Sequence, residues 1–204
     1  KDSDGGAWRT GALAQASSWY NETLNTATRG SRQEFPEVAV IVAESNKVTI
    51  YDGDDATLPM WMVFTAANGP YSTGFWEGAP ATSLFALNGL LCVGLDGSVT
   101  ETGMLEIDFP SASLSRRTSN TGYGGFGLPL ISGGQLSALP TRWVSGDSLV
   151  NGYINDVAMT VLPDAPTDPA TGLPVPTIAV ATDGGVSVIK DDGTVVDITH
   201  TDGN

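Results

Sequence analysis

Few residues of this chain could perform acid–base or nucleophilic catalysis. His200 is the only histidine among 204 residues, and it lies close to the C-terminal end. A Ser-His-Asp relay needs a histidine held firmly between a nucleophile and a carboxylate, and chain ends are poorly held. The sequence also contains no GxSxG, HExxH, Walker or CxxC motif. We therefore predict that His200 is not catalytic and that the chain is not an enzyme.

Paired carboxylates are the remaining route to catalysis, because glycoside hydrolysis needs only two acids that face each other across a cleft. The chain has 23 Asp and Glu residues, so many pairs are available. Glu101, Glu106 and Asp108 lie in or near a predicted strand, on which Glu106 and Asp108 would share one face. We interpret that face as a solvated outer surface rather than a cleft.

Large aromatic residues lie in two glycine-rich segments that are predicted to be exposed loops. In PYSTGFWEG, Phe75 and Trp76 adjoin Glu77, a combination that binds sugars but also suits contact with another subunit. Tyr123 and Phe126 lie in SNTGYGGFGLPLISGG, which lacks the lysine and the strand-then-helix context of a phosphate loop. We favour a protein partner for both pairs of aromatic residues.

Calcium is the one cofactor that the sequence admits. The acidic turns Asp52-Gly53-Asp54-Asp55 and Asp191-Asp192-Gly193 carry the oxygen ligands that Ca²⁺ prefers. Neither run matches the full twelve-residue calcium loop with its closing glutamate, and acids with glycine also form ordinary turns. We therefore interpret both runs as turns first and as calcium sites second.

The charge balance argues against nucleic acids and membranes as partners. Nine basic residues face 23 acidic ones, which gives a formal charge of −14. Binding to phosphates or to an anionic bilayer needs clustered Lys and Arg. No apolar run reaches the ~18 to 20 residues of a membrane-spanning helix.

The chain begins at Lys1 rather than at Met, so we expect a processed chain or a fragment of a longer protein.

The single cysteine lies inside an apolar run. Cys92 belongs to Leu90-Leu91-Cys92-Val93, and with no second cysteine it cannot form a disulfide within the chain. A free cysteine in such a run is usually a small buried hydrophobic residue. We expect Cys92 to lie in a core strand.

The elements that would position these residues are predicted to be β-strands. The 25 glycines, the 12 prolines and the low 16% of charged residues are typical of short strands joined by tight turns. Asn88-Gly89 is a strong hairpin signal, and Asp183-Gly184-Gly185 and Asp192-Gly193 join three strands near the C-terminus. The proline-rich run from Pro163 to Pro174 is predicted to be a surface loop, because proline is excluded from sheet interiors.

The hairpin turns recur at a nearly constant interval. They fall near positions 45, 88, 134 and 184, so they are 43, 46 and 50 residues apart. This spacing is close to the ~40 to 50 residues of one β-propeller blade. We predict an all-β domain of propeller-like blades over residues 38–204, divided at about 38–80, 81–127, 128–150 and 151–204. A β-sandwich also has regular hairpins and remains the alternative. In either case the strands around Val40, Leu84 and Val180 should be buried.

Residues 1–37 read differently from the rest. They are polar and lack strand periodicity, but they carry Trp8, Trp19 and Tyr20. Exposed aromatic side chains forfeit roughly 1.5 to 3 kcal/mol each relative to burial. We predict an extended N-terminal arm that places these three residues on a partner surface.

Several runs of the chain resemble a module of large structural proteins from marine bacteriophages. The runs are DSDGGAWR, SWYNETLNTATRGSRQEFPEVAVIVAESNKVTIYDGDD, LPMWMVF and INDVAMTVLPDAPTDPATGLPVPTIAVATDGGVSVIKDDGTVVDIT. In those proteins such segments are flanked by propeller-like repeats and laminin-G-like domains. The resemblance covers most of the chain, least so residues 110–150. It implies a tail-associated location in the virion, such as a fibre or nozzle, after synthesis in the host cytoplasm.

Three functions follow from these observations, and we rank them. The first is a structural virion protein of the tail that acts in assembly and in host attachment, with copies of itself and other tail proteins as partners. The second is a carbohydrate-binding module that uses Tyr71, Trp76 and neighbouring acids, which would take a host surface glycan. The third is a glycan depolymerase with paired carboxylates.

Overall fold

A computed structural model of the chain describes residues 19–45, 47–65, 80–96, 103–119, 123–125, 142–144, 148–169 and 171–199, with backbone only at 123–125 and 142–144. These residues form an all-β structure of three antiparallel sheets, accompanied by one short 3₁₀ helix, η4, at Trp19–Asn21. The prediction of an all-β chain is confirmed. No helix in the described ranges has the length and hydrophobicity needed to cross a membrane.

The first sheet has the order β1-β2-β3 and is the shortest in sequence. Its strands are β1 (Ala39–Glu44), β2 (Lys47–Asp52) and β3 (Met60–Thr65). The segment before them extends the sheet at the free edge of β3, where Arg29 forms an isolated antiparallel bridge with Met62. The amide of Gly30 donates to Trp61 O at 2.9 Å. Part of the predicted N-terminal arm therefore belongs to the first sheet.

The middle sheet has six strands in the order of the sequence. They are β4 (Ala81–Leu87), β5 (Leu90–Leu95), β6 (Gly103–Asp108), β7 (Ser113–Arg117), β8 (Tyr123–Gly125) and β9 (Arg142–Val144). The predicted Asn88-Gly89 turn joins β4 to β5, and both residues have positive φ, 52° and 80°. That conformation is the two-residue type I′ turn that favours Asn-Gly.

The last sheet contains β10 (Ile154–Thr160), β11 (Thr177–Thr182), β12 (Gly185–Ile189) and β13 (Val195–Ile198), in that order. The predicted turns at Asp183-Gly184 and around Gly193 join its last three strands. The proline-rich run is the β10–β11 connection, and it is held together by its own bridge between Thr167 and Pro174. Its prediction as a loop outside the sheets is confirmed.

The predicted repeat at residues 128–150 does not form a sheet of its own in the described residues. Its one described strand, β9, pairs with β8 and extends the middle sheet. The described residues form three sheets, so the division into four repeats stays a prediction. The Gly133-Gly134 turn that suggested the fourth lies outside the described residues.

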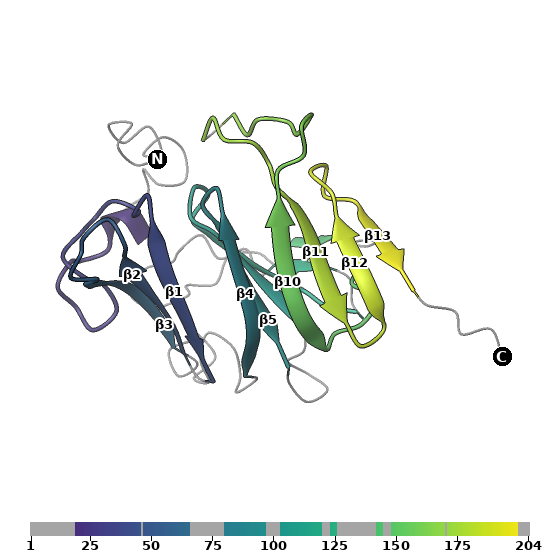
Figure 1. Ribbon diagram of the computed structural model, residues 1–204, viewed down its shortest axis with the longest axis horizontal. Coiled ribbons are helices and arrows are strands. Elements are labelled where there is room, and N and C mark those ends of the chain that lie inside the picture. The colour runs from purple at the N-terminus through teal and green to yellow at the C-terminus, as the bar shows by residue number, and fades with distance from the viewer. Residues whose placement is uncertain are drawn as a thin grey trace.

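The middle sheet packs on both of its faces. Its face with Leu91, Val93 and Leu105 joins the first sheet in one hydrophobic cluster. Cys92 and Met104, on the opposite face, pack with the last sheet in a second cluster. Because successive side chains of a strand point to opposite faces, the middle sheet is covered on both sides. Figure 1 shows the first strands of the three sheets, β1, β4 and β10, in a row across the molecule.

Candidate functional site

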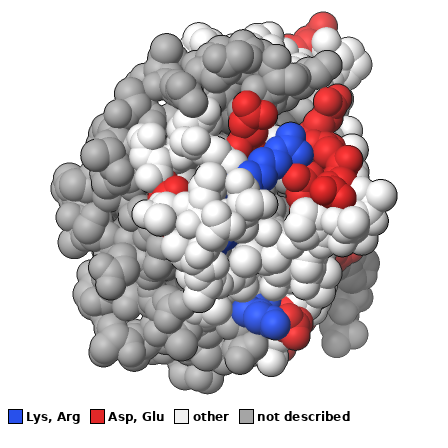
Figure 2. Space-filling model, turned by 90° about the vertical axis from the view of Figure 1, so that its left-hand side faces the viewer, with Lys and Arg blue, Asp and Glu red and all other residues white. Residues whose placement is uncertain are grey.

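The outer face of the first sheet, which we define by Val38, Val40, Val42 and Tyr51, is apolar and is exposed along β1. On β2 it continues with the half-buried Tyr51 and the buried Thr49. In β1 half-buried residues alternate strictly with exposed ones. Val40 and Val42 are each 41% exposed, and Val38, just before the strand, is 57% exposed. Val40 lies opposite Tyr51 on β2. Figure 2 views this side of the molecule and shows uncharged surface between a group of acids around a basic residue at the upper right and an acid–base pair near the bottom. The expectation that Val40 is buried is wrong, because no described sheet packs on that face.

The outer face of the last sheet is also apolar, and it is rich in small residues. The register aligns Ala158, Ala179, Val188 and Val196 in one row across the four strands. A second row runs from Asp156 through Ala181 and Val186 to Ile198, and Thr160 and Thr177 lie opposite each other in a third. Val196 is 44% exposed and Ile198 is 59% exposed. The opposite side of the same strands, with Val157, Val180 and Ile189, is buried against the middle sheet. The predicted burial of Val180 is therefore confirmed.

These two faces differ from an ordinary solvated sheet face. A sheet that has water on one side normally alternates apolar residues inside with polar residues outside. Here the described charges are Asp156 on the last sheet and, at one end of the first sheet, Glu44 and Lys47, which pair with each other at 2.9 Å. Contiguous apolar surface of this kind marks sites of protein contact.

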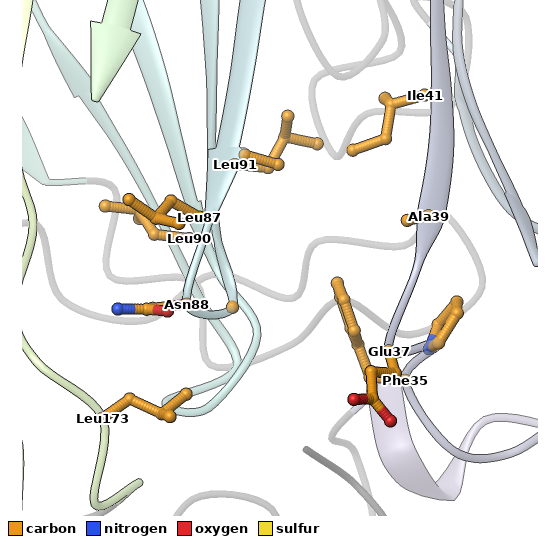
Figure 3. A pocket seen from close by; sticks show the side chains of 12 residues that line it. Phe35, Glu37, Ala39, Ile41, Leu87, Asn88, Leu90, Leu91 and Leu173 are labelled. Atoms are coloured by element: carbon orange, nitrogen blue, oxygen red, sulfur yellow. The ribbon is translucent and has the colours of Figure 1, made fainter. Parts of the chain in front are cut away.

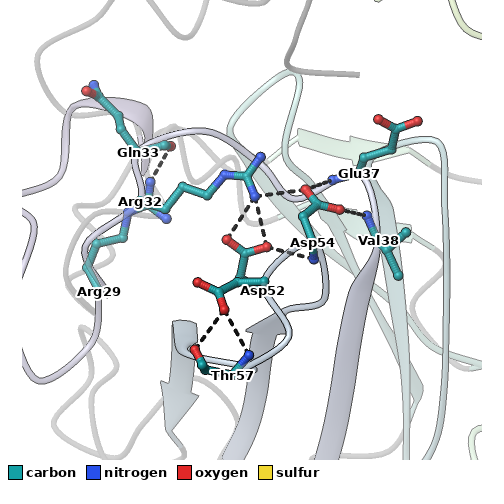
Figure 4. Close-up of polar contacts among 9 residues, drawn as sticks. Arg29, Arg32, Gln33, Glu37, Val38, Asp52, Asp54 and Thr57 are labelled. Carbon is teal, nitrogen blue, oxygen red and sulfur yellow. Dashed lines mark hydrogen bonds and ion pairs between the residues drawn. The ribbon is translucent and has the colours of Figure 1, made fainter.

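A charged cluster fixes the loops beside the first sheet (Figure 4). Arg32 Nη1 lies 2.8 Å from both carboxylate oxygens of Asp52 and 2.8 Å from Asp54 Oδ2. The Asp54 carboxylate also accepts hydrogen bonds from the backbone amides of Val38 and Glu37, at 2.9 Å each. These two hydrogen bonds, together with the guanidinium of Arg32, lower the pKa of Asp54. The cluster ties the segment before β1 to the β2–β3 loop.

The two predicted calcium turns differ from a calcium site. At the first, the guanidinium of Arg32 already occupies the space between Asp52 and Asp54 that a cation would need. At the second, Asp192 Oδ1 accepts hydrogen bonds from the hydroxyl and the backbone amide of Thr194, at 2.6 Å and 2.9 Å. These hydrogen bonds lower the pKa of Asp192. No group of three or more metal-ligating side chains occurs within the described ranges.

A groove separates the first sheet from the turn end of the β4–β5 hairpin. It has a volume of about 320 Å³ and is mostly apolar. Figure 3 shows Ile41 on β1 and Leu91 on β5 facing one another across it, with Asn88 and Leu173 at the far end. Asn88 Nδ2 donates to the carbonyl of Pro174 at 2.7 Å, so the β10–β11 connection closes one side of the groove.

A second hollow of about 300 Å³ continues beyond Asn88 and contains two carboxylates, Asp108 and Asp168. Burial raises the pKa of Asp108, and the charge of Asp168 adds to this shift. Ser111 hydrogen-bonds the Asp108 carboxylate through its backbone amide at 3.1 Å. The sequence analysis named Asp108 but not Asp168, because the two residues are 60 positions apart and only the course of the proline-rich connection brings them together.

The interpretation of Glu106 and Asp108 as a solvated face is wrong. Glu106 Oε1 accepts a hydrogen bond from Arg117 Nε at 2.8 Å. The two side chains are only 12% and 7% exposed. Asp108 lies in the second hollow described above. The face they share is the one that packs toward the last sheet, so Glu106 and Arg117 form an interior ion pair.

Two of the predicted partner-contact residues are core residues. Trp19 is 0% exposed and Tyr20 is 4% exposed, and both belong to the cluster between the first and middle sheets. Trp19 packs edge-on against Trp61 and Phe109, with ring centroids 5.4 Å and 5.6 Å away. The prediction that the arm offers them to a partner is wrong, because the chain's own sheets provide the apolar surface.

The structure does not describe the side chains of the other predicted site residues. Tyr123 is described by its backbone alone, in β8, where it pairs with Arg117 and Val144. The remaining ones lie outside the described residues: Trp8, Tyr71, Phe75, Trp76, Glu77, Glu101, Phe126 and His200. The predicted roles of all these residues stay predictions.

Comparisons of the chain with protein-family models, with curated protein sequences and with solved structures give no significant match.

Proposed function

We propose that this chain is a non-catalytic structural module of a bacteriophage tail, which acts by packing its sheets into a larger assembly. In this proposal the three sheets are propeller-like blades. The single observation that carries it is that both ends of the three-sheet stack present apolar faces, with Val40 on one and Val196 on the other. A module that worked alone in water would gain nothing from two such faces.

Burial energetics support an assembly role. Each apolar side chain that leaves water on docking contributes roughly 1.5 to 3 kcal/mol at full burial, so a row of partly exposed valines is a substantial driving force. The low charge of the two faces lowers the desolvation cost of docking. The sequence resemblance to phage structural proteins supports the tail as the place where docking occurs.

The arrangement of the sheets supports the blade interpretation. Strand order follows the sequence in each sheet, and the first strands β1, β4 and β10 lie next to one another. Thr82 Oγ1 on β4 donates to Ile154 O on β10 at 2.7 Å, which joins two of these first strands directly. In a propeller the innermost strands of successive blades likewise lie side by side around the central channel, while the faces of the blades pack on one another.

The location is tested on purified particles of the phage that encodes the chain. We expect mass spectrometry to find this polypeptide in the particles and antibodies against the folded chain to label the tail in electron micrographs. Particles that lack the polypeptide, or antibodies that bind only the head, would contradict the proposal. Release of reducing sugars from host glycans by the pure chain would contradict its non-catalytic part.

A further inference from the structure

We infer that the outer face of the last sheet packs on the outer face of the first sheet of a second copy of the chain, head to tail. The occupant of each apolar face is then the opposite face of a neighbouring copy. This inference rests on the proposed assembly function and specifies its partner and contact surfaces.

The first argument is continuity with the packing inside the chain. The first sheet uses Ile41 and Ile50 to pack on one face of the middle sheet, and the last sheet uses Val157 and Val180 to pack on the other. Each internal contact therefore joins one apolar sheet face to the apolar face of the next sheet. Continuing the same stacking beyond the last sheet brings a first sheet of another copy against it.

The second argument is the shape of the two faces. The first sheet presents branched and aromatic side chains, Val38, Val40, Val42 and Tyr51, whereas the last sheet has a row that begins with Ala158 and Ala179. Large side chains pack well into the depressions over alanines, and close packing decides the strength of such contacts. A second last sheet offers such side chains only on β12 and β13, at Val188 and Val196, whereas the first sheet offers them along the whole of β1. The complementary pairing is the heterologous one.

The third argument is electrostatic. The whole chain carries a formal charge of −14, so two copies repel one another. The described part of the two faces carries Asp156 on one side and the internally paired Glu44 and Lys47 on the other. Glu37 and the cluster of Arg32 with Asp52 and Asp54 border the Val38 end. Contact between the faces thus adds little repulsion of its own. Because salt screens the general repulsion, added salt should strengthen the association rather than weaken it.

The size of the contact sets the affinity to expect. Strands about 20 Å long and 4.8 Å apart give roughly 400 Å² for a four-stranded face and roughly 300 Å² for the three-stranded face that would pack on it. A standard interface buries about 800 Å² on each partner. The head-to-tail contact is therefore weak for an isolated pair, and it is reinforced when repeated contacts close a ring.

The test compares three proteins by sedimentation velocity from micromolar to millimolar concentration: the full chain, Val40→Glu and Val196→Glu. We expect the unchanged chain to form species larger than a dimer at the upper concentrations, more so in high salt. Each variant has one damaged face and one intact face, so each alone should remain monomeric. An equimolar mixture of the two variants should form dimers and nothing larger, because only one pair of intact faces remains.

Leu162→Glu is the matched control, since Leu162 is 47% exposed but lies in the β10–β11 connection. It should assemble like the unchanged chain. Circular dichroism and thermal unfolding show whether each variant is folded. If a variant does not fold, Val40→Thr or Val196→Thr replaces it, and the same loss, in weaker form, is expected.

The inference is overturned if the unchanged chain stays monomeric at millimolar concentration, or if one variant alone still dimerises, which would indicate like-with-like contact. A chain that labels the tail but stays monomeric would leave the proposed function standing and remove this inference. A chain that assembles head to tail but is absent from purified particles would leave this inference standing and remove the proposed function.

Discussion

Trp19 Nε1 donates a hydrogen bond to the backbone carbonyl of Phe109 at 2.5 Å, although the two residues are 90 positions apart. The same indole packs edge-on against Tyr20, Phe35, Trp61 and Phe109. One side chain from the start of the described structure therefore connects the first sheet to the turn between β6 and β7. Residues 19–37 form an internal strap of the domain.

Trp19→Ala should destabilise the fold by about 3 to 5 kcal/mol, the usual cost of emptying a buried tryptophan site. Trp19→Phe keeps most of the packing but loses the hydrogen bond to Phe109, so about 1 kcal/mol is expected there. Urea unfolding followed by far-ultraviolet circular dichroism measures both values. Tyr153→Ala is the control, because Tyr153 is 41% exposed. A Trp19→Ala protein as stable as the unchanged chain would show that the strap is not part of the core.

Gly94→Ala should loosen the contact between the middle and last sheets. A Cβ atom at Gly94 would lie 2.6 Å from Ile154 Cγ2 and 2.9 Å from Ser83 Oγ. Overpacking of this kind costs about 1 to 3 kcal/mol. The measurement is a double-mutant cycle with Ile154→Ala, which removes Cγ2 together with the rest of the side chain beyond Cβ and should recover part of the loss. Strict additivity of the two changes would contradict the contact.

Cys92 should not react with a thiol reagent while the protein is folded. The side chain is 0% exposed, and burial raises the thiol pKa well above its ordinary value, so the reactive thiolate is scarce as well as inaccessible. Labelling with a chromogenic disulfide in native buffer should therefore be slower by several orders of magnitude than labelling in urea. Rapid labelling of the native chain would place β5 at the surface.

Asp54 should contribute to the pH dependence of stability in the acid range. Its folded-state pKa lies below the ordinary value of 3.8, so its contribution is present above about pH 4 and is lost as the pH falls through the lowered value. In Asp54→Asn that part of the acid destabilisation should disappear. Thermal unfolding between pH 2 and pH 7 measures the difference, with Asp164→Asn in the β10–β11 connection as the control. Parallel pH curves for the unchanged chain and Asp54→Asn would rule out this role.

The pairing of strands could be predicted from the sequence because it depends on local chemistry. Asn88 and Gly89 both have positive φ in the β4–β5 turn, and Gly185 has positive φ directly after Asp183-Gly184. The strands on either side of each turn then pair in register. Alternation along β2 likewise places Val48 and Ile50 on one face, where both are buried, although Thr49 on the other face is buried as well. These features need no knowledge of distant residues.

The stacking of sheets could not be predicted in the same way. Val40 and Val180 have equally apolar surroundings in sequence, yet one is 41% exposed and the other is 0% exposed. Which face of a strand is covered depends on a sheet from elsewhere in the chain. The alternation of side chains along the strand itself gives no information about that sheet. Trp19 reads as an unpartnered aromatic residue for the same reason, since its partners Trp61 and Phe109 lie 42 and 90 positions away.

Strand order in the three sheets has a consequence for synthesis. Every described strand pairs only with its neighbours in sequence, so each sheet can form once its own segment has left the ribosome. Local pairings of this kind form quickly, whereas contacts between distant segments form late. The cluster around Trp19 and Trp61, however, stays incomplete until Phe109 has been made. A nascent chain that pauses after β3 therefore exposes its largest aromatic residues, and this is the stage at which a chaperone would be most useful.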